Sequence, residues 1–143
     1  MKRVFNHIIA LLAILFTLNA CATYSAHEVA PTTIHQAKEQ IPEAALMDVG
    51  IEFFISAELS EEEAKEEGTS SEIRKAESHY IPYHLKNTLQ RSSHWGAVRM
   101  IPAGSKGSDL LVRGSIIRSN GEYLILKVEA VDASGNIWLN KTY

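Results

Sequence analysis

The sequence predicts an α+β fold: a mostly antiparallel sheet of about five strands with one kinked helix packed on one face, after a signal peptide and a flexible tether. Three features predict it. Apolar segments rich in Val, Ile and Leu flank one long helical segment, three of them follow one another closely, and turn-forming residues separate those three. A chain of 143 residues has the length of one domain, and we expect it to divide into residues 1–20, 21–45 and 46–143.

The first predicted strand covers residues 46–55. Successive side chains of a strand point to opposite faces, so Val49, Ile51 and Phe53 share one face and Phe54 takes the other. We expect the first group, together with Met47, to face the core.

A glutamate-rich segment follows at residues 58–67, with six Glu in ten residues. Ser60 and Glu63 have the spacing of a capping box, in which two side chains satisfy free backbone donors at a helix start, and Gly68 is suited to ending that turn. The segment is typical of a solvated surface. A calcium site is the alternative, but the Asp/Asn-rich spacing of an EF-hand is absent.

The long helix is predicted to open at Thr69 and Glu72, which again have capping-box spacing, and to end near Ser92. Pro82 interrupts it, because proline lacks the N–H and clashes with the preceding turn. The helix therefore either kinks or restarts at Pro82. An apolar stripe on it comprises Ile81, Leu85 and Leu89, extended upstream by Tyr80 and Ile73.

Four predicted strands follow the helix, at residues 97–101, 110–118, 123–131 and 137–143. The dipeptide Asn120-Gly121 is a strong hairpin signal, because both residue types accept positive φ. In the third strand Leu124, Leu126 and Val128 share a face with Ala130. The last three strands are therefore predicted to be antiparallel.

The first residues predict export. Lys2 and Arg3 precede eleven residues, 8–18, that are apolar apart from Thr17. A membrane-spanning helix needs about 20 apolar residues. This segment is shorter and is typical of the apolar region of a secretory signal.

The chain's single cysteine follows directly, in Leu18-Asn19-Ala20-Cys21, which resembles the lipobox of bacterial lipoproteins. The resemblance implies cleavage between Ala20 and Cys21 and acylation of Cys21, which would anchor the protein in a membrane. Ala22 in place of Asp implies sorting to the outer membrane, facing the periplasm. The alternative is a plain secretory signal.

The net charge and the number of cysteines exclude further kinds of function. The net charge of −3 predicts no nucleic-acid partner, which would need clustered Lys and Arg, and a single cysteine forms no internal disulfide.

Residues 22–45 show no periodicity and contain Pro31 and Pro42, as expected of a tether. The alternative for this stretch is a segment that folds on a partner.

The chain from about residue 47 onward also resembles a known family. The helix ends in Leu85…Leu89 and Ser92 to Trp95, and a strand follows that begins Asp109-Leu-Leu-Val-Arg-Gly114. This pattern, over about residues 47–143, is similar to the small α+β domain of the TolB amino-terminal domain, curli-secretion lipoproteins and lipoprotein activators of penicillin-binding proteins. It implies a non-catalytic binding or accessory module for an envelope protein complex. Those domains usually continue into a second helix that packs on the sheet.

Catalytic patterns are weak. A helical zinc site needs two histidines at i and i+4, which lie on one face of the helix. His79 and His84 are five residues apart, about 140° around a helix, and His94 is ten residues further along the chain, so none of the three has this spacing. No G-x-S-x-G motif occurs. We expect no enzyme activity, cofactor or metal. The alternative is a periplasmic hydrolase or metal-dependent enzyme that uses these histidines.

Three antiparallel strands offer two faces, and one helix covers only one of them. The face opposite Leu124, Leu126 and Val128 is half apolar, which is more than a solvated face needs. We expect another chain to pack there, either an envelope partner or a second copy, or else a missing C-terminal segment. The alternative is that the glutamate-rich segment or the tether covers it. The expected contact residues are Tyr123, Ile125, Trp138 and Tyr143.

Overall fold

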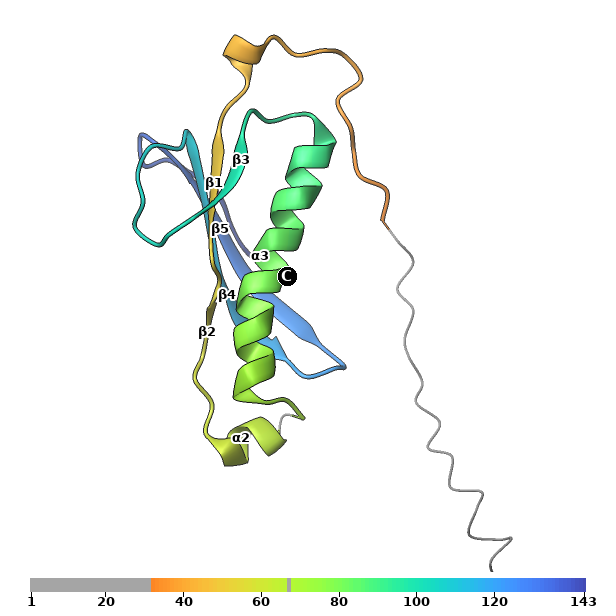
Figure 1. Cartoon of the computed structure of the whole chain (residues 1–143), viewed down its shortest axis with the longest axis vertical. Coiled ribbons are helices and arrows are strands. Elements are labelled where there is room, and N and C mark those ends of the chain that lie inside the picture. Colours follow the sequence, from red (N-terminus) through yellow and green to blue (C-terminus); the bar gives the residue numbers. More distant parts are fainter. Residues whose placement is uncertain (1–31, 67) are drawn as a thin grey trace, which may run out of the picture. The chain divides into compact units, whose positions relative to one another are not determined.

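The computed structural model describes residues 32–66 and 68–143, of which 33–143 form one compact unit. The α+β class is confirmed: the described part contains a six-stranded sheet and two α-helices, α2 (Glu61–Glu66) and α3 (Ser71–Ser92), after a short 3-10 helix at Glu43–Ala45 (Figure 1). The strands are β1 (Val49–Glu52), β2 (Ile55–Ser56), β3 (Val98–Ile101), β4 (Leu110–Ser119), β5 (Leu124–Asp132) and β6 (Ile137–Thr142). No helix among the described residues is both long and apolar enough to span a bilayer.

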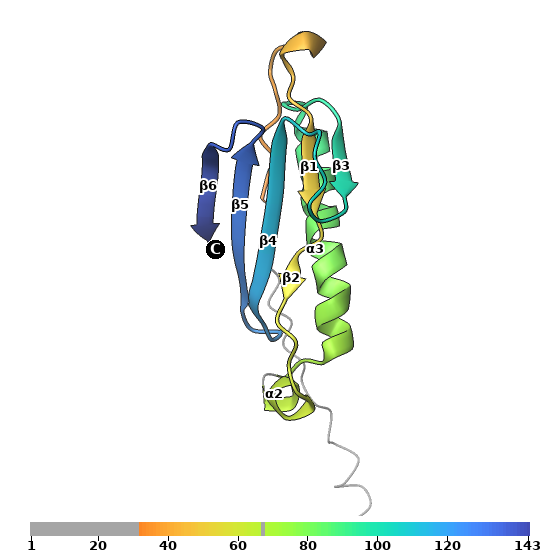
Figure 2. The same ribbon diagram turned by 90° about the vertical axis from the view of Figure 1, so that its left-hand side faces the viewer.

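The sheet is mixed rather than mostly antiparallel. Its strand order is β3-β1-β4-β5-β6, with β2 pairing β4 below β1 (Figure 2). The antiparallel pairing of β4, β5 and β6 is as predicted. However, β1 runs parallel to both β3 and β4, and β2 runs parallel to β4. Helix α3 lies between β2 and β3 in the chain and provides the crossover that a parallel pairing requires.

The first strand is broken between Glu52 and Ile55, which reverses the predicted roles of the two phenylalanines. Phe54 is 4% exposed and belongs to the core, whereas Phe53 is 46% exposed. The Phe54 N–H donates to the Ser78 carbonyl of α3 at 3.0 Å instead of to a neighbouring strand. The prediction that Phe53 faces the core is therefore wrong.

The Ser78 carbonyl can accept the bond from Phe54 because Pro82 leaves it without a donor from the helix. In a helix the carbonyl of residue 78 would accept from the N–H of residue 82, which proline lacks. The N–H of Phe54 takes the place of the missing helix donor, and buried Pro82 lies inside one uninterrupted helix, α3. The predicted restart at Pro82 does not occur, and β1–β2 is attached to the middle of α3.

The helix starts are capped by serines. The predicted capping box of α2 is confirmed, because the N–H of Ser60 donates to Glu63 Oε2 at 3.0 Å and the N–H of Glu63 donates to Ser60 Oγ at 3.3 Å. Helix α3 is capped one residue later than predicted, by Ser70 rather than Thr69: Ser70 Oγ accepts from the N–H of Ile73 at 3.2 Å.

The apolar stripe of α3 packs on the sheet only in part. Ile81, Leu85 and Leu89 contact the core, as predicted. Ile73 and Tyr80 are 51% and 66% exposed, so the predicted upstream extension is wrong. Consecutive residues are about 100° apart around a helix, which turns Tyr80 away from the stripe that Ile81 begins.

The core lies between α3 and the sheet. Its buried members come from β1, β3, β4 and β5 and, with Phe54, from the link between β1 and β2: Val49, Ile51, Phe54, Val98, Leu110, Val112, Ile116, Val128 and Ala130. At the upper end of β1, the Asp48 carboxylate accepts from the N–H of Ala97 at 2.7 Å, and Asp109 accepts from the N–H of Asp48 at 2.8 Å. These bonds fix the entries to β3 and β4 beside β1.

The described end of the predicted tether contacts the end of α3. The N–H of Ala37 donates to the Ser92 carbonyl at the end of α3, at 2.9 Å. The predicted signal peptide, Cys21 and residues 22–31 lie outside the described residues.

Candidate binding groove

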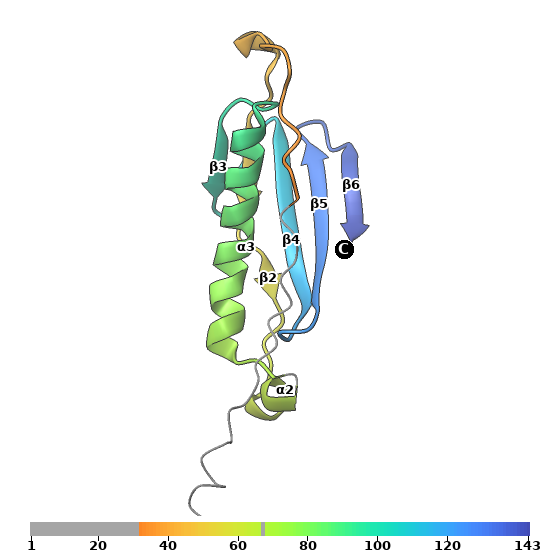
Figure 3. The same cartoon turned by 90° about the vertical axis from the view of Figure 1, so that its right-hand side faces the viewer.

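Helix α3 covers only one half of its side of the sheet. It packs on β1, β2, β3 and β4, and β5 and β6 extend beyond it in both side views (Figures 2 and 3). A helix is about 10 Å across and neighbouring strands are about 4.8 Å apart, so one helix covers roughly two to three strands. A sheet five strands wide at this level leaves a strip about one helix wide.

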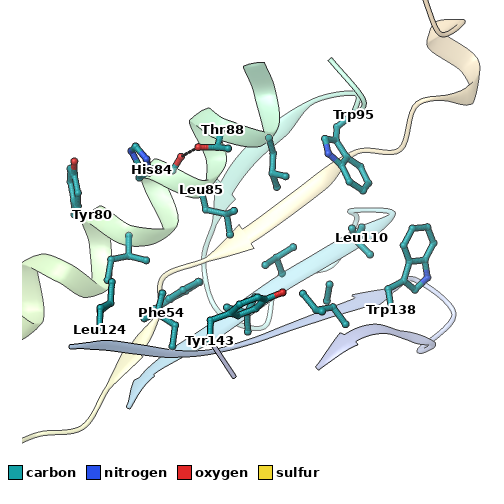
Figure 4. A pocket seen from close by; sticks show the side chains of 17 residues that line it. Phe54, Tyr80, His84, Leu85, Thr88, Trp95, Leu110, Leu124, Trp138 and Tyr143 are labelled. Atoms are coloured by element: carbon teal, nitrogen blue, oxygen red, sulfur yellow. Dashed lines mark hydrogen bonds between the residues drawn. The ribbon is translucent and has the colours of Figure 1, made fainter. Parts of the chain in front are cut away.

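The uncovered strip forms an apolar hollow of about 740 Å³. None of its 17 lining residues is Asp, Glu, Lys or Arg (Figure 4). We call this hollow the groove, and its lining is Phe54, Tyr80, Ile81, His84, Leu85, Thr88, Leu89, Trp95, Leu110, Val112, Leu124, Leu126, Val128, Ala130, Trp138, Leu139 and Tyr143.

The groove has a floor, one wall and an open side. The floor is the face of β4 and β5 that carries Val128 and Ala130, which are 9% and 6% exposed. Helix α3 forms the wall, from which Tyr80, His84 and Thr88 project in Figure 4. Towards the open side, Leu124, Trp138 and Tyr143 are 51%, 54% and 59% exposed. A continuous apolar surface of this kind usually marks a contact site.

A hydrogen-bonded turn holds Trp138 at the groove. Its indole N–H donates to Asp132 Oδ2 at 3.0 Å. The side chain and backbone of Asn136, the Trp138 indole and the backbone of Ser134 together lower the pKa of Asp132 to about 2. The carboxylate of Asp132 thus orders both the β5–β6 turn and the indole.

The turn should respond to acid. Because folding lowers the pKa of Asp132 from its ordinary value of about 4, its contribution to stability is present above pH 4 and is lost as the pH falls through about 2. In a Trp95→Phe variant, which leaves Trp138 as the reporter, we expect the fluorescence to be constant from pH 7 to about 4 and to change towards pH 2.

The matched control is Trp95→Phe with Asp132→Ala, which should show the acid form's fluorescence already at neutral pH and no transition of this kind. A full transition in this double variant would mean that another group controls the indole.

The structure does not bring the four predicted contact residues onto one face. Tyr143 exchanges two backbone hydrogen bonds with Leu126, so it shares the groove face of Leu126, and Trp138 also lines the groove. Ile125 alternates with Leu126 and faces the other side. Tyr123 lies in the β4–β5 turn, where its ring is 5.5 Å from the Arg118 guanidinium.

The middle of the face opposite α3 carries a polar network. Arg113 Nε donates to Glu129 Oε1 at 2.7 Å, and Asn140 Nδ2 donates to Glu129 Oε2 at 3.3 Å. These groups cross β4, β5 and β6 in the middle of that face, as is usual for the solvated side of a sheet. The apolar groove is on the helix side instead.

The sequence predicts Leu124, Leu126 and Val128 on the face that the helix covers, whereas in the structure they line the groove beside it. The predicted numbers of helices and strands do indicate that part of the sheet is uncovered. A single predicted helix cannot cover five strands, whichever face it packs on.

Within residues 32–66 and 68–143, no three His, Cys, Asp or Glu side chains gather as ligands would. His79 Nδ1 lies 2.8 Å from the Lys75 carbonyl, and its ring contacts Phe53 with 4.5 Å between centroids. His84 lines the groove and stacks on Tyr80, 6.1 Å away between centroids.

Neither family models, nor curated proteins, nor solved structures match this chain.

Proposed function

We propose that this protein is a lipid-anchored envelope protein of the outer membrane that faces the periplasm, has no catalytic activity of its own, and holds a partner protein in the groove. The observation that carries the proposal is the uncovered apolar half of the sheet beside α3. Leaving Leu124, Trp138 and Tyr143 in water forgoes the stabilisation that burial would give, about 25 cal/mol per Å² of apolar surface. A bound partner recovers it.

The polar groups of the groove support binding rather than chemistry. The Thr88 hydroxyl donates to the carbonyl of His84 at 3.0 Å, so it satisfies its own helix. The Trp138 indole is engaged with Asp132. An uncharged groove also lacks the cations that nucleic acid would require.

The anchor rests on the lipobox-like motif Leu18-Asn19-Ala20-Cys21. Acyl chains contribute about 0.8 kcal/mol per buried CH₂, so several chains on Cys21 would hold the protein durably on a membrane. The groove would then meet partners that lie close to that membrane.

One experiment tests the anchor and the groove together. The full chain is expressed in a Gram-negative bacterium with radioactive palmitate and a photoreactive amino acid at position 124, in the groove. We expect the label on the protein, its recovery in the outer-membrane fraction, and a crosslink to one defined protein after irradiation.

Two matched variants control this experiment. Cys21→Ala should lose the label and the membrane association. The photoreactive residue at position 137, whose isoleucine is 60% exposed and pairs with Val131 on the opposite face of the sheet, should give no such crosslink. Equal labelling of Cys21→Ala would end the lipoprotein proposal, and equal crosslinking from both positions would end the proposal that the groove is the binding site.

A further inference from the structure

The width of the groove matches one α-helix. The helix side of the sheet is half occupied by α3, and the remaining strip over β4, β5 and β6 spans about two strand spacings, or roughly 10 Å. That is the diameter of a helix. A helix laid beside α3 would complete the helical layer of the fold.

We infer that the occupant of the groove is an amphipathic α-helix of a partner polypeptide, with an apolar stripe towards the sheet and acidic residues along its flanks. This inference rests on the proposed binding function and deepens it.

The length of the apolar floor defines the length of that helix. On β5 the groove residues run from Leu124 to Ala130, six steps of about 3.4 Å, or roughly 20 Å. A helix rises about 1.5 Å per residue, so about 14 residues cover the floor. Four turns place apolar residues at i, i+3/i+4 and i+7 positions against it.

The charges at the edges favour acidic flanks. Arg91 follows His84 and Thr88 on the same side of α3, at i+7 and i+3. On β6, Lys141 pairs with Val128 across the strands, so it shares the groove face, and its ammonium lies 4.9 Å from the Tyr143 ring centroid. Two carboxylates of the unit already accept hydrogen bonds: Glu77 Oε1 accepts from Ser119 Oγ at 2.6 Å, and Asp132 accepts from the β5–β6 turn.

A second copy is a poorer occupant. To fill the groove of its partner, α3 would have to present an apolar outer face. Its residues opposite the Ile81–Leu85 stripe are mostly polar: Glu72, Ala76, Tyr83, Asn87 and Gln90. An acyl chain is also a poorer occupant, because it is narrower than the strip and carries no charges along two flanks.

The test uses intrinsic fluorescence. The chain has two tryptophans, Trp95 and Trp138, and both line the groove. The full chain is titrated with three synthetic peptides of about 14 residues. One has a Leu/Ala stripe with Glu flanks, one has the same stripe with Lys flanks, and one has the composition of the first with its apolar residues scattered. Palmitate is titrated in parallel.

We expect the Glu-flanked peptide to gain helicity and to shift the tryptophan emission to shorter wavelength. It should bind about tenfold tighter than the scattered peptide and about fivefold tighter than the Lys-flanked one, because each exposed ion pair contributes up to about 1 kcal/mol. Leu124→Glu should abolish this binding. Ile137→Glu, on the opposite face of the sheet, should leave it unchanged.

Three results would overturn the inference. If palmitate shifts the emission and the Glu-flanked peptide does not, the groove binds an acyl chain but not a helix, and the proposed function survives only if position 124 still crosslinks to a protein. If neither ligand shifts it, both proposals fail. If ultracentrifugation shows dimers that Leu124→Glu dissociates, the occupant is a second copy.

Discussion

Replacing Ile51 with Ala should lower the free energy of unfolding by about 2–5 kcal/mol, the usual cost of removing a large buried aliphatic side chain. Ile51 is 0% exposed and lies in β1, which pairs with β3 on one side and β4 on the other. Little room exists there for neighbouring side chains to fill the cavity without moving a strand. Urea unfolding followed by circular dichroism measures the effect.

The same substitution at Ile55 is the matched control. Ile55 is 74% exposed in β2, only four residues away, and Ile55→Ala should change stability by less than about 0.5 kcal/mol. Similar losses for the two variants would contradict the position of β1 at the centre of the core.

The elements that depend on sequence neighbours were predictable. The Ser60–Glu63 capping box forms as its spacing indicates, and Asn120-Gly121 lies in the turn between β4 and β5, with Gly121 at φ 64°. The alternation of β5 also places Val128 and Ala130 on the buried face. In each case the interacting residues are at most a few positions apart.

The elements that depend on distant residues were not predictable. No local pattern indicates that β1 lies between β3 and β4, or that Phe54 rather than Phe53 faces the core. The second result depends on the Ser78 carbonyl, which accepts from the N–H of Phe54 because Pro82 cannot donate. The segment around Phe54 must pack on α3 before Phe54 rather than Phe53 is favoured in the core.

One extra residue in β6 places Trp138 on the groove face. Ala130 pairs with Leu139 and Val131 pairs with Ile137, which leaves Trp138 in a bulge between them. A shift of one residue changes the face to which a strand's side chains point. Uniform alternation therefore could not place Trp138 on the groove side. The count of one helix for five strands did indicate an uncovered surface, but not on which face.

Gly114 should be the most sensitive glycine of the described sheet. A Cβ at this position would lie 2.8 Å from two ring carbons of Phe54 and 2.9 Å from the carbonyl oxygen of Lys127. The ring belongs to the core, and the carbonyl belongs to the neighbouring strand β5, so neither moves freely. We expect Gly114→Ala to lower the free energy of unfolding by about 1–3 kcal/mol through overpacking.

Gly50→Ala separates this effect from the general effect of adding a methyl group to a strand. A Cβ on Gly50 would meet the ends of the Ser108 and Ile101 side chains, which can rotate away. Its cost should therefore be smaller than that of Gly114→Ala. Phe54 also lines the groove, so its displacement by Gly114→Ala should alter the tryptophan emission and weaken binding of the Glu-flanked peptide, whereas Gly50→Ala should leave both unchanged. If Gly114→Ala is as stable as the wild-type chain, the close packing of β4, β5 and Phe54 is wrong, and the floor of the groove with it.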